Sequence, residues 1–182
     1  MPDIGHSIQI GAAPHLMHPL VASGEGFSRW WASDVTEEKA AENVEPGFFN
    51  RATVYGLRPI LIAAPRQAHW VCQSGKKWSG TRLLFDLAEQ KDQTLLRFTH
   101  ANWQAATDYF RACTPTWGEL MLRIKATPEG ISPGPLFVSN GLAYLASNSK
   151  RRRFRIAANS IHRHESLLSG MLLSTVAKYG SP

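Results

Sequence analysis

The sequence is poor in cysteine and lacks the long apolar runs of membrane helices. Its two cysteines, Cys72 and Cys113, lie far apart and form no CxxC pair. This excludes a disulfide framework and a zinc knuckle, so we expect two buried, reduced thiols. No stretch approaches the roughly 18 apolar residues of a membrane span, and no basic start precedes an apolar segment. We therefore expect a cytoplasmic protein without a transmembrane segment.

Motifs that mark common chemistry are also missing. The sequence contains no GxSxG elbow, no P-loop and no dinucleotide fingerprint. His15 and His18 lie three residues apart, but no third ligand is apparent for them, and metal binding at His162 and His164 is only a weak alternative. We expect surface positions for His15 and His18, and we predict no metal and no cofactor.

Acidic residues are almost absent from the last part of the chain. The net charge is +6, and residues 131–182 carry seven Lys and Arg against one Glu, which leaves 13 basic and 13 acidic residues in 1–130. A balanced main domain argues against a groove that follows nucleic-acid phosphates. The basic tail, with KRRRFR at 150–155, is predicted to be a solvated extension, partly helical or disordered, with contact to acidic lipid or nucleic acid as the alternative.

The first 72 residues predict one strand, two short helices and further strands. Ile4, Ile8 and Ile10 alternate as in a strand, with His6 on the same face. Residues 13–23 and 24–33 read as two short helices that glycines separate. Residues 36–46 are polar and acidic, which favours a solvated loop, whereas 47–72 is strand-like with at least two strands.

Residues 81–103 predict an antiparallel hairpin with a definite register. The residue numbers of two opposed positions in an antiparallel pair always have the same sum. Phe85 opposite Phe98 therefore places Leu83 opposite His100. The same register puts Asp86 opposite Arg97 on the other face as a cross-strand charge pair. Residues 90–93 remain as a four-residue loop. One face of the hairpin is therefore apolar and needs a cover.

The cover is predicted to be an amphipathic helix within residues 106–126. Its apolar residues recur at steps of three and four. Pro115 predicts an interruption, with a short helical turn before it and a main helix that Thr114 or Thr116 caps.

Several segments together resemble a known superfamily. They are the WW pair at Trp30 and Trp31, WSGTRLLFDL at 78–87, TLLRFTHANW at 94–103 and YFRACTPTWGELMLRIK at 109–125. Over about 8–135 the sequence resembles the SRPBCC superfamily, in its branch similar to the activator of heat-shock-protein-ninety ATPase. The resemblance implies an α+β helix-grip fold, in which a curved antiparallel sheet wraps around a long C-terminal helix and two short helices follow the first strand. We expect this domain at residues 1–135 and the extension at 136–182.

The resemblance also implies a cavity between sheet and helix for a hydrophobic or amphipathic small molecule. Large apolar side chains are the candidate ligand contacts, together with one titratable group: Phe49, Trp70, Phe85, Phe98, His100, Trp103, Trp117 and Met121. The alternative is that these residues pack against one another as ordinary core.

Two further functions stay open. Some members of the superfamily are cyclases or dehydratases, and His100 is the weak candidate for a general acid or base there. No carboxylate shares its predicted face, which favours a structural histidine near Trp103 or the helix start. A module that binds a chaperone is the other alternative.

Overall fold

The computed structural model describes residues 1–38, 42–75, 77–139 and 141–143. The chain divides into two compact units, and the first spans Met1–Leu145. Of the predicted extension 136–182, residues 136–139 and 141–143 are described, whereas the basic segment 150–155 and the histidines at 162 and 164 lie outside the described residues. All structural statements below concern the first unit.

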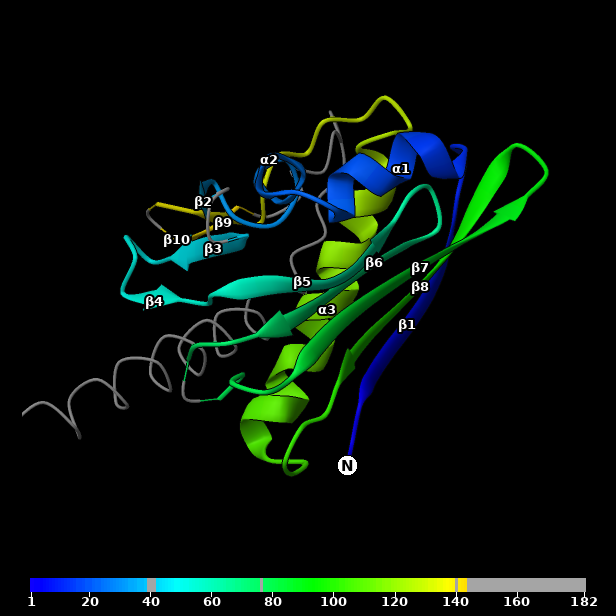
Figure 1. The fold of residues 1–182 in the computed structure, drawn as a ribbon. Coiled ribbons are helices and arrows are strands. Elements are labelled where there is room, and N and C mark those ends of the chain that lie inside the picture. The colour runs from blue at the N-terminus through cyan, green and yellow to red at the C-terminus, as the bar shows by residue number, and fades with distance from the viewer. Residues whose placement is uncertain (39–41, 76, 140, 144–182) are drawn as a thin grey trace, which may run out of the picture. The chain divides into compact units, whose positions relative to one another are not determined.

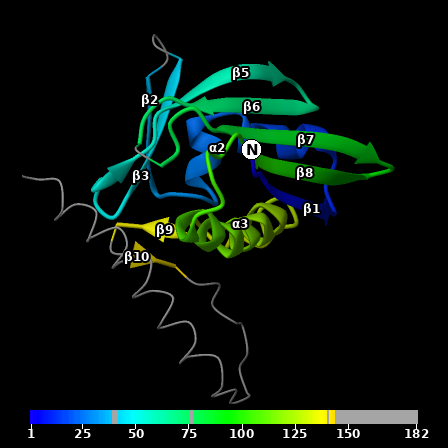
Figure 2. The same ribbon diagram turned by 90° about the horizontal axis from the view of Figure 1, so that it is seen from below.

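Strands dominate the described part of the unit. Eight of them form one sheet in the order β1-β8-β7-β6-β5-β3-β2, with β4 paired to β3, and every pairing in it is antiparallel. The strands of this sheet are β1 (Ile4–Ile10), β2 (Asp34–Glu38), β3 (Asn43–Phe48), β4 (Thr53–Val54), β5 (Leu57–Ala63), β6 (Gln67–Cys72), β7 (Arg82–Gln90) and β8 (Gln93–Ala101). The sheet curves around the long helix α3 (Asp108–Ala126), which lies across its inner face (Figures 1 and 2). The predicted α+β helix-grip fold is confirmed.

The β7–β8 hairpin has the predicted register. Phe85 pairs with Phe98, and Leu83 pairs with His100. The inner-face positions of both strands are buried because they alternate toward α3. The predicted four-residue loop is wrong, since the ladder continues to Gln90 and Gln93 and leaves a two-residue turn in which Lys91 has φ 58°. A two-residue turn of this kind matches the twist of the flanking strands better than a longer loop.

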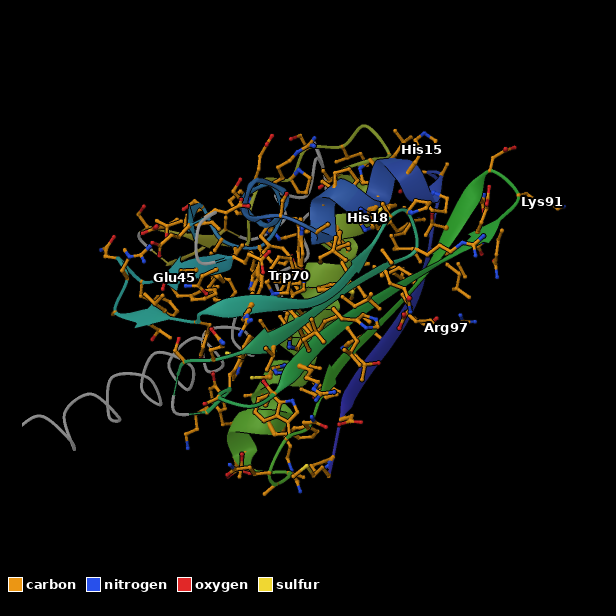
Figure 3. All side chains as sticks on the ribbon, viewed as in Figure 1. His15, His18, Glu45, Trp70, Lys91 and Arg97 are labelled. Carbon is orange, nitrogen blue, oxygen red and sulfur yellow. The ribbon has the colours of Figure 1, made fainter. Side chains whose placement is uncertain are left out.

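The outer face differs from the prediction in one contact. Asp86 does lie opposite Arg97 in the ladder. However, its carboxylate accepts hydrogen bonds from Gln67 Nε2 at 2.9 Å and contacts His69 Nε2 at 3.0 Å, both on the neighbouring strand β6. Arg97 extends away from α3 (Figure 3). Gln67 and His69 are therefore the partners of this carboxylate in the described residues, in place of the predicted Arg97.

Two short helices follow β1, as predicted: α1 (Pro14–Val21) and α2 (Gly24–Ser28). Ser23 caps α2 by accepting a hydrogen bond from the Gly26 amide at 3.0 Å. Buried indoles satisfy two carbonyls at the end of α1, because Trp30 Nε1 donates to Leu20 O at 2.8 Å and Trp70 Nε1 donates to Val21 O at 2.9 Å. Tryptophans from two other segments thus fasten α1 to the core.

The predicted surface position of His18 is wrong, whereas that of His15 is confirmed. His18 is 7% exposed, and its Nε2 lies 3.1 Å from the carbonyl oxygen of Gln67. His15 is exposed. The two rings therefore face different surroundings although they lie three residues apart on α1.

The polar segment 36–46 is not a loop, contrary to the prediction. It forms most of the β2–β3 hairpin at the sheet edge, where Thr36 pairs with Glu45. Acidic residues tolerate this position because β2 is largely exposed. The strand-like reading of 49–51 is also wrong, since Phe49, Asn50 and Arg51 have φ of 53°, 55° and 62° and form a turn.

Helix α3 is one continuous helix of 19 residues, so the predicted interruption at Pro115 is wrong. Thr107 is the cap, and its hydroxyl accepts from the Phe110 amide. Pro115 removes one backbone donor, at a cost of roughly 3 kcal/mol. A single buried stripe on both sides of the proline outweighs this cost, since it continues from Cys113 through Trp117 to Ile124.

The segment after α3 returns to the region after α2. Leu136 N donates to Trp30 O at 3.1 Å and Phe137 N donates to Trp31 O at 2.9 Å. This segment contains the two-stranded sheet of β9 (Phe137–Val138) and β10 (Gly141–Leu142). Arg123 of α3 is fully buried and fixes the segment, because its guanidinium donates to Glu119 Oε1 and to the carbonyls of residues 133, 134 and 143. No helix in the described residues has the length and hydropathy needed to cross a membrane.

Candidate functional site

Aromatic rings fill the region between the sheet and the N-terminal half of α3. Phe98 of β8 lies 4.3 Å from Trp117 of α3 and 4.9 Å from Phe85 of β7, measured between ring centroids. Trp78, in the turn after β6, stacks on Tyr55 at 4.2 Å and lies 5.8 Å from Trp117. We call the connected rings of Tyr55, Trp78, Phe85, Phe98, His100, Trp103 and Trp117 the aromatic cluster.

His100 lies at the centre of this cluster and is fully buried. Trp117 Nε1 donates to His100 Nδ1 at 3.1 Å. Thr81 Oγ1 uses its hydrogen on the carbonyl of Trp78 at 2.6 Å, so it accepts from His100 Nε2 at 2.9 Å. These bonds fix the neutral tautomer with hydrogen on Nε2, because a second proton on Nδ1 would face the indole hydrogen.

Burial lowers the pKa of His100 to about 3. The cause is desolvation, which disfavours the imidazolium in an apolar aromatic surrounding. The ring is therefore neutral at physiological pH, and both nitrogens already bond to protein groups. In this geometry His100 positions Trp117 and Thr81.

A second polar group lies at the edge of the cluster. The hydroxyls of Tyr55 and Tyr109 are 2.8 Å apart. Cys113 is close to Tyr109 and Trp78, whose hydrogens favour its thiolate, but burial dominates and raises the pKa of Cys113 to about 12. Burial also raises the pKa of both tyrosines. All three groups are thus protonated, and Cys113 and Cys72 are buried free thiols as predicted.

Five of the predicted contact residues meet in the cluster: Phe85, Phe98, His100, Trp103 and Trp117. Trp70 joins it indirectly, since its ring lies 5.4 Å from Phe27, which in turn lies 6.4 Å from Phe85; Figure 3 shows Trp70 in the interior. Met121 is buried on α3. Phe49 lies elsewhere, in the turn after β3, with its ring 6.0 Å from Phe137.

Sequence reasoning missed three members or neighbours of the cluster. Trp78 sits in a turn, where alternation predicts nothing, yet its side chain is 5% exposed. No sequence pattern indicated that Tyr55 and Tyr109 would lie at this site. The signal for Trp78 was its residue type, because a tryptophan beside Ser and Gly in a turn is larger than a solvated turn needs.

Two indole hydrogens of the cluster have no conventional hydrogen-bond acceptor within the described residues. They belong to Trp78 and Trp103, and both Nε1 atoms are inaccessible to solvent. Trp103 follows β8 and lies beneath two half-buried rings of α3, with centroids 6.1 Å from Tyr109 and 5.3 Å from Phe110. Unsatisfied buried donors are rare in folded proteins.

A scan against protein-family models found no match, and a search of curated proteins found none either. Solved structures do match. The Aha1 dimer from Colwellia psychrerythraea is 26% identical, covers 71% of this chain and 97% of its own, and has a TM-score of 0.61. CalU16 from Micromonospora echinospora is 15% identical, covers 98% of this chain and 88% of its own, and has a TM-score of 0.60.

A START superfamily protein from Mycobacterium smegmatis is 12% identical, covers 70% of this chain and 97% of its own, and has a TM-score of 0.55. The antiparallel sheet around α3 defines a helix-grip fold, and these neighbours confirm the predicted resemblance to the SRPBCC superfamily. Within that superfamily, the likeness to Aha1 agrees with the predicted branch.

Proposed function

We propose that the unit binds a hydrophobic or amphipathic small molecule between the sheet and α3. One observation supports this most: the region under α3 is built from aromatic rings with very few polar groups, and two of its indole donors, Trp78 and Trp103, have no nitrogen or oxygen acceptor among the described residues. Binding sites for small molecules have this composition, with apolar walls and few polar groups that orient the guest. The START superfamily neighbour supports the same class of function.

The proposed entrance is at the N-terminal end of α3. Tyr109 and Phe110 are only half-buried there, and they cover Trp103. Rotation of these two rings would open the cluster to a guest without breaking a strand pairing. Movement of this size is ordinary for side chains on binding.

Native mass spectrometry of the purified full chain tests the proposal directly. We expect a retained small molecule, or uptake of added dodecanoate with a saturable change in tryptophan fluorescence. Phe98→Leu, within the cluster, should weaken dodecanoate binding, whereas Leu122→Ala on the exposed face of α3 should not. No retained molecule and no saturable uptake would contradict the proposal.

A second candidate is a module that binds a chaperone. The likeness to Aha1 at 26% identity over 71% of the chain favours it. Purified full chain added to heat-shock-protein-ninety should then raise the ATPase rate in a saturable manner, and an unchanged rate would remove this candidate.

The enzymatic alternative depends on His100 as a proton carrier. Its two ring nitrogens both bond to protein groups in this structure, so no observation here favours it. Its test remains His100→Gln, which should abolish turnover while ligand binding persists.

A further inference from the structure

We infer that Trp103, with Trp78 beside it, recognises an acceptor oxygen on the bound molecule, so that the guest carries a carbonyl or carboxylate group. This inference rests on the proposed function and specifies its ligand. It begins from Trp103 Nε1, which is buried without an acceptor among the described residues, on a side chain only 3% exposed.

Other buried indoles of the chain show the contrast. Trp30 donates to Leu20 O, Trp70 donates to Val21 O, and Trp117 donates to His100 Nδ1, at 2.8, 2.9 and 3.1 Å. Each of these side chains is as deeply buried as Trp103. The fold therefore supplies acceptors to three other buried indoles, and a missing acceptor at Trp103 marks a position that a bound group completes.

Both donors lie around the same residue. The ring centroids of Trp78 and Trp103 are 4.4 and 4.5 Å from that of His100, and 6.4 Å from each other. Trp78 also lies beside the Cys113 thiol, but sulfur is a weak acceptor. Two donors within one small region favour a group that can accept more than one hydrogen bond.

Charges near the proposed entrance agree with an acceptor. The N-terminus of the 19-residue helix α3 carries the positive end of the helix dipole. Lys77 Nζ lies 6.0 Å from the centre of the Tyr109 ring. Two acids lie near this region in space, but Asp3 accepts from the Asn102 amide at 2.9 Å, and Asp108 is exposed in the first turn of α3.

The guest is therefore an apolar chain or ring system that bears a carboxylate, ketone or ester oxygen. A carboxylate offers two acceptor oxygens and no donor, which suits two indole hydrogens. An ammonium group has donors only and would leave both indoles unpaired. Headgroup preference at constant tail length therefore tests the inference.

The experiment measures binding of dodecanoate, 2-dodecanone and dodecylamine to the full chain by isothermal titration calorimetry. We expect the two oxygen compounds to bind at least tenfold more tightly than the amine. Trp103→Phe keeps an aromatic ring and removes the donor, so it should weaken dodecanoate and 2-dodecanone about tenfold, which corresponds to one hydrogen bond, and leave dodecylamine unchanged. Trp70→Phe is the matched control, because its indole already has an acceptor, and it should leave the headgroup preference intact.

Nuclear magnetic resonance of the wild-type chain gives a second readout that needs no variant. The indole resonance of Trp103 should move downfield with dodecanoate and stay in place with dodecylamine. Equal binding of all three compounds, or a Trp103 resonance that none of them moves, overturns the inference while the proposed function stands. If none of the three binds, the proposed function itself fails.

Discussion

Protonation of His100 should destabilise the fold in a pH range where the rest of the chain can be measured. Its pKa is about 3 in the folded state, against the ordinary pKa of 6.5 for a histidine side chain. The unfolded chain therefore binds a proton first as the pH falls, and folding stability is lost between pH 6.5 and about 3. Above pH 6.5 the ring is neutral in both states and this contribution is fully retained. Between pH 7.5 and 4.5 the loss amounts to about 3 kcal/mol.

Urea unfolding of the wild type and of His100→Gln at several pH values isolates this effect. Glutamine keeps one donor and one acceptor for Thr81 and Trp117 but does not titrate. The stability advantage of the wild type should shrink by about 3 kcal/mol from pH 7.5 to 4.5, while other titrating groups cancel in the difference. The exposed His15→Gln serves as control and should give a curve parallel to the wild type. If the curve of His100→Gln is also parallel to the wild type, the ring does not titrate as its burial requires, and the assigned tautomer loses its support.

Three further predictions concern the framework. Arg123→Met should lower the free energy of unfolding by about 3–5 kcal/mol, measured as a lower urea midpoint, because it leaves the buried acceptors of the guanidinium without a donor. Arg123→Lys should restore little of this stability, since one ammonium group cannot reach all of these acceptors. Gly26→Ala should lower the free energy of unfolding by about 3 kcal/mol in the same assay, because the added Cβ would lie 2.1 Å from a backbone oxygen of α1. Gly118→Ala is the control, since its added Cβ would have its nearest neighbour at 3.7 Å, and it should be neutral or stabilise α3 by up to about 1 kcal/mol. Cys72 and Cys113, whose pKa values burial raises to about 12, should resist an aromatic disulfide reagent at pH 8 until urea unfolds the chain, and a fast native phase would contradict their burial.

Residue alternation predicted the central hairpin because one of its faces is apolar throughout. A register shift by one residue would have left Phe85 and Phe98 on opposite faces of the hairpin, so the pattern admits a single pairing. It also placed Leu83 opposite His100 correctly. The resemblance of the same segments then predicted the helix-grip fold.

Elements stabilised by tertiary contacts were harder to predict. Strand β2 is largely exposed at the sheet edge and ends in Glu37 and Glu38, so the composition of this part of the hairpin resembles that of a loop. Helix α3 continues through Pro115 because the stripe that includes Trp117 is buried on the sheet, a gain that local propensity does not include. The sequence predicted only part of the candidate site. Strand residues such as Phe98 follow the alternation of a buried strand, whereas Trp78 reaches the cluster from a turn, where no such pattern exists.

The position of β1 has a consequence for biosynthesis. Ile4 pairs with His100, so the first strand of the unit waits for a partner that is made 96 residues later. At roughly 5–20 residues per second, the ribosome leaves this apolar strand without its ladder for about 5–20 seconds. The nascent chain thus exposes the unpaired strand β1 until β8 emerges from the ribosome. A holdase chaperone that binds exposed apolar segments would act on the chain in this interval.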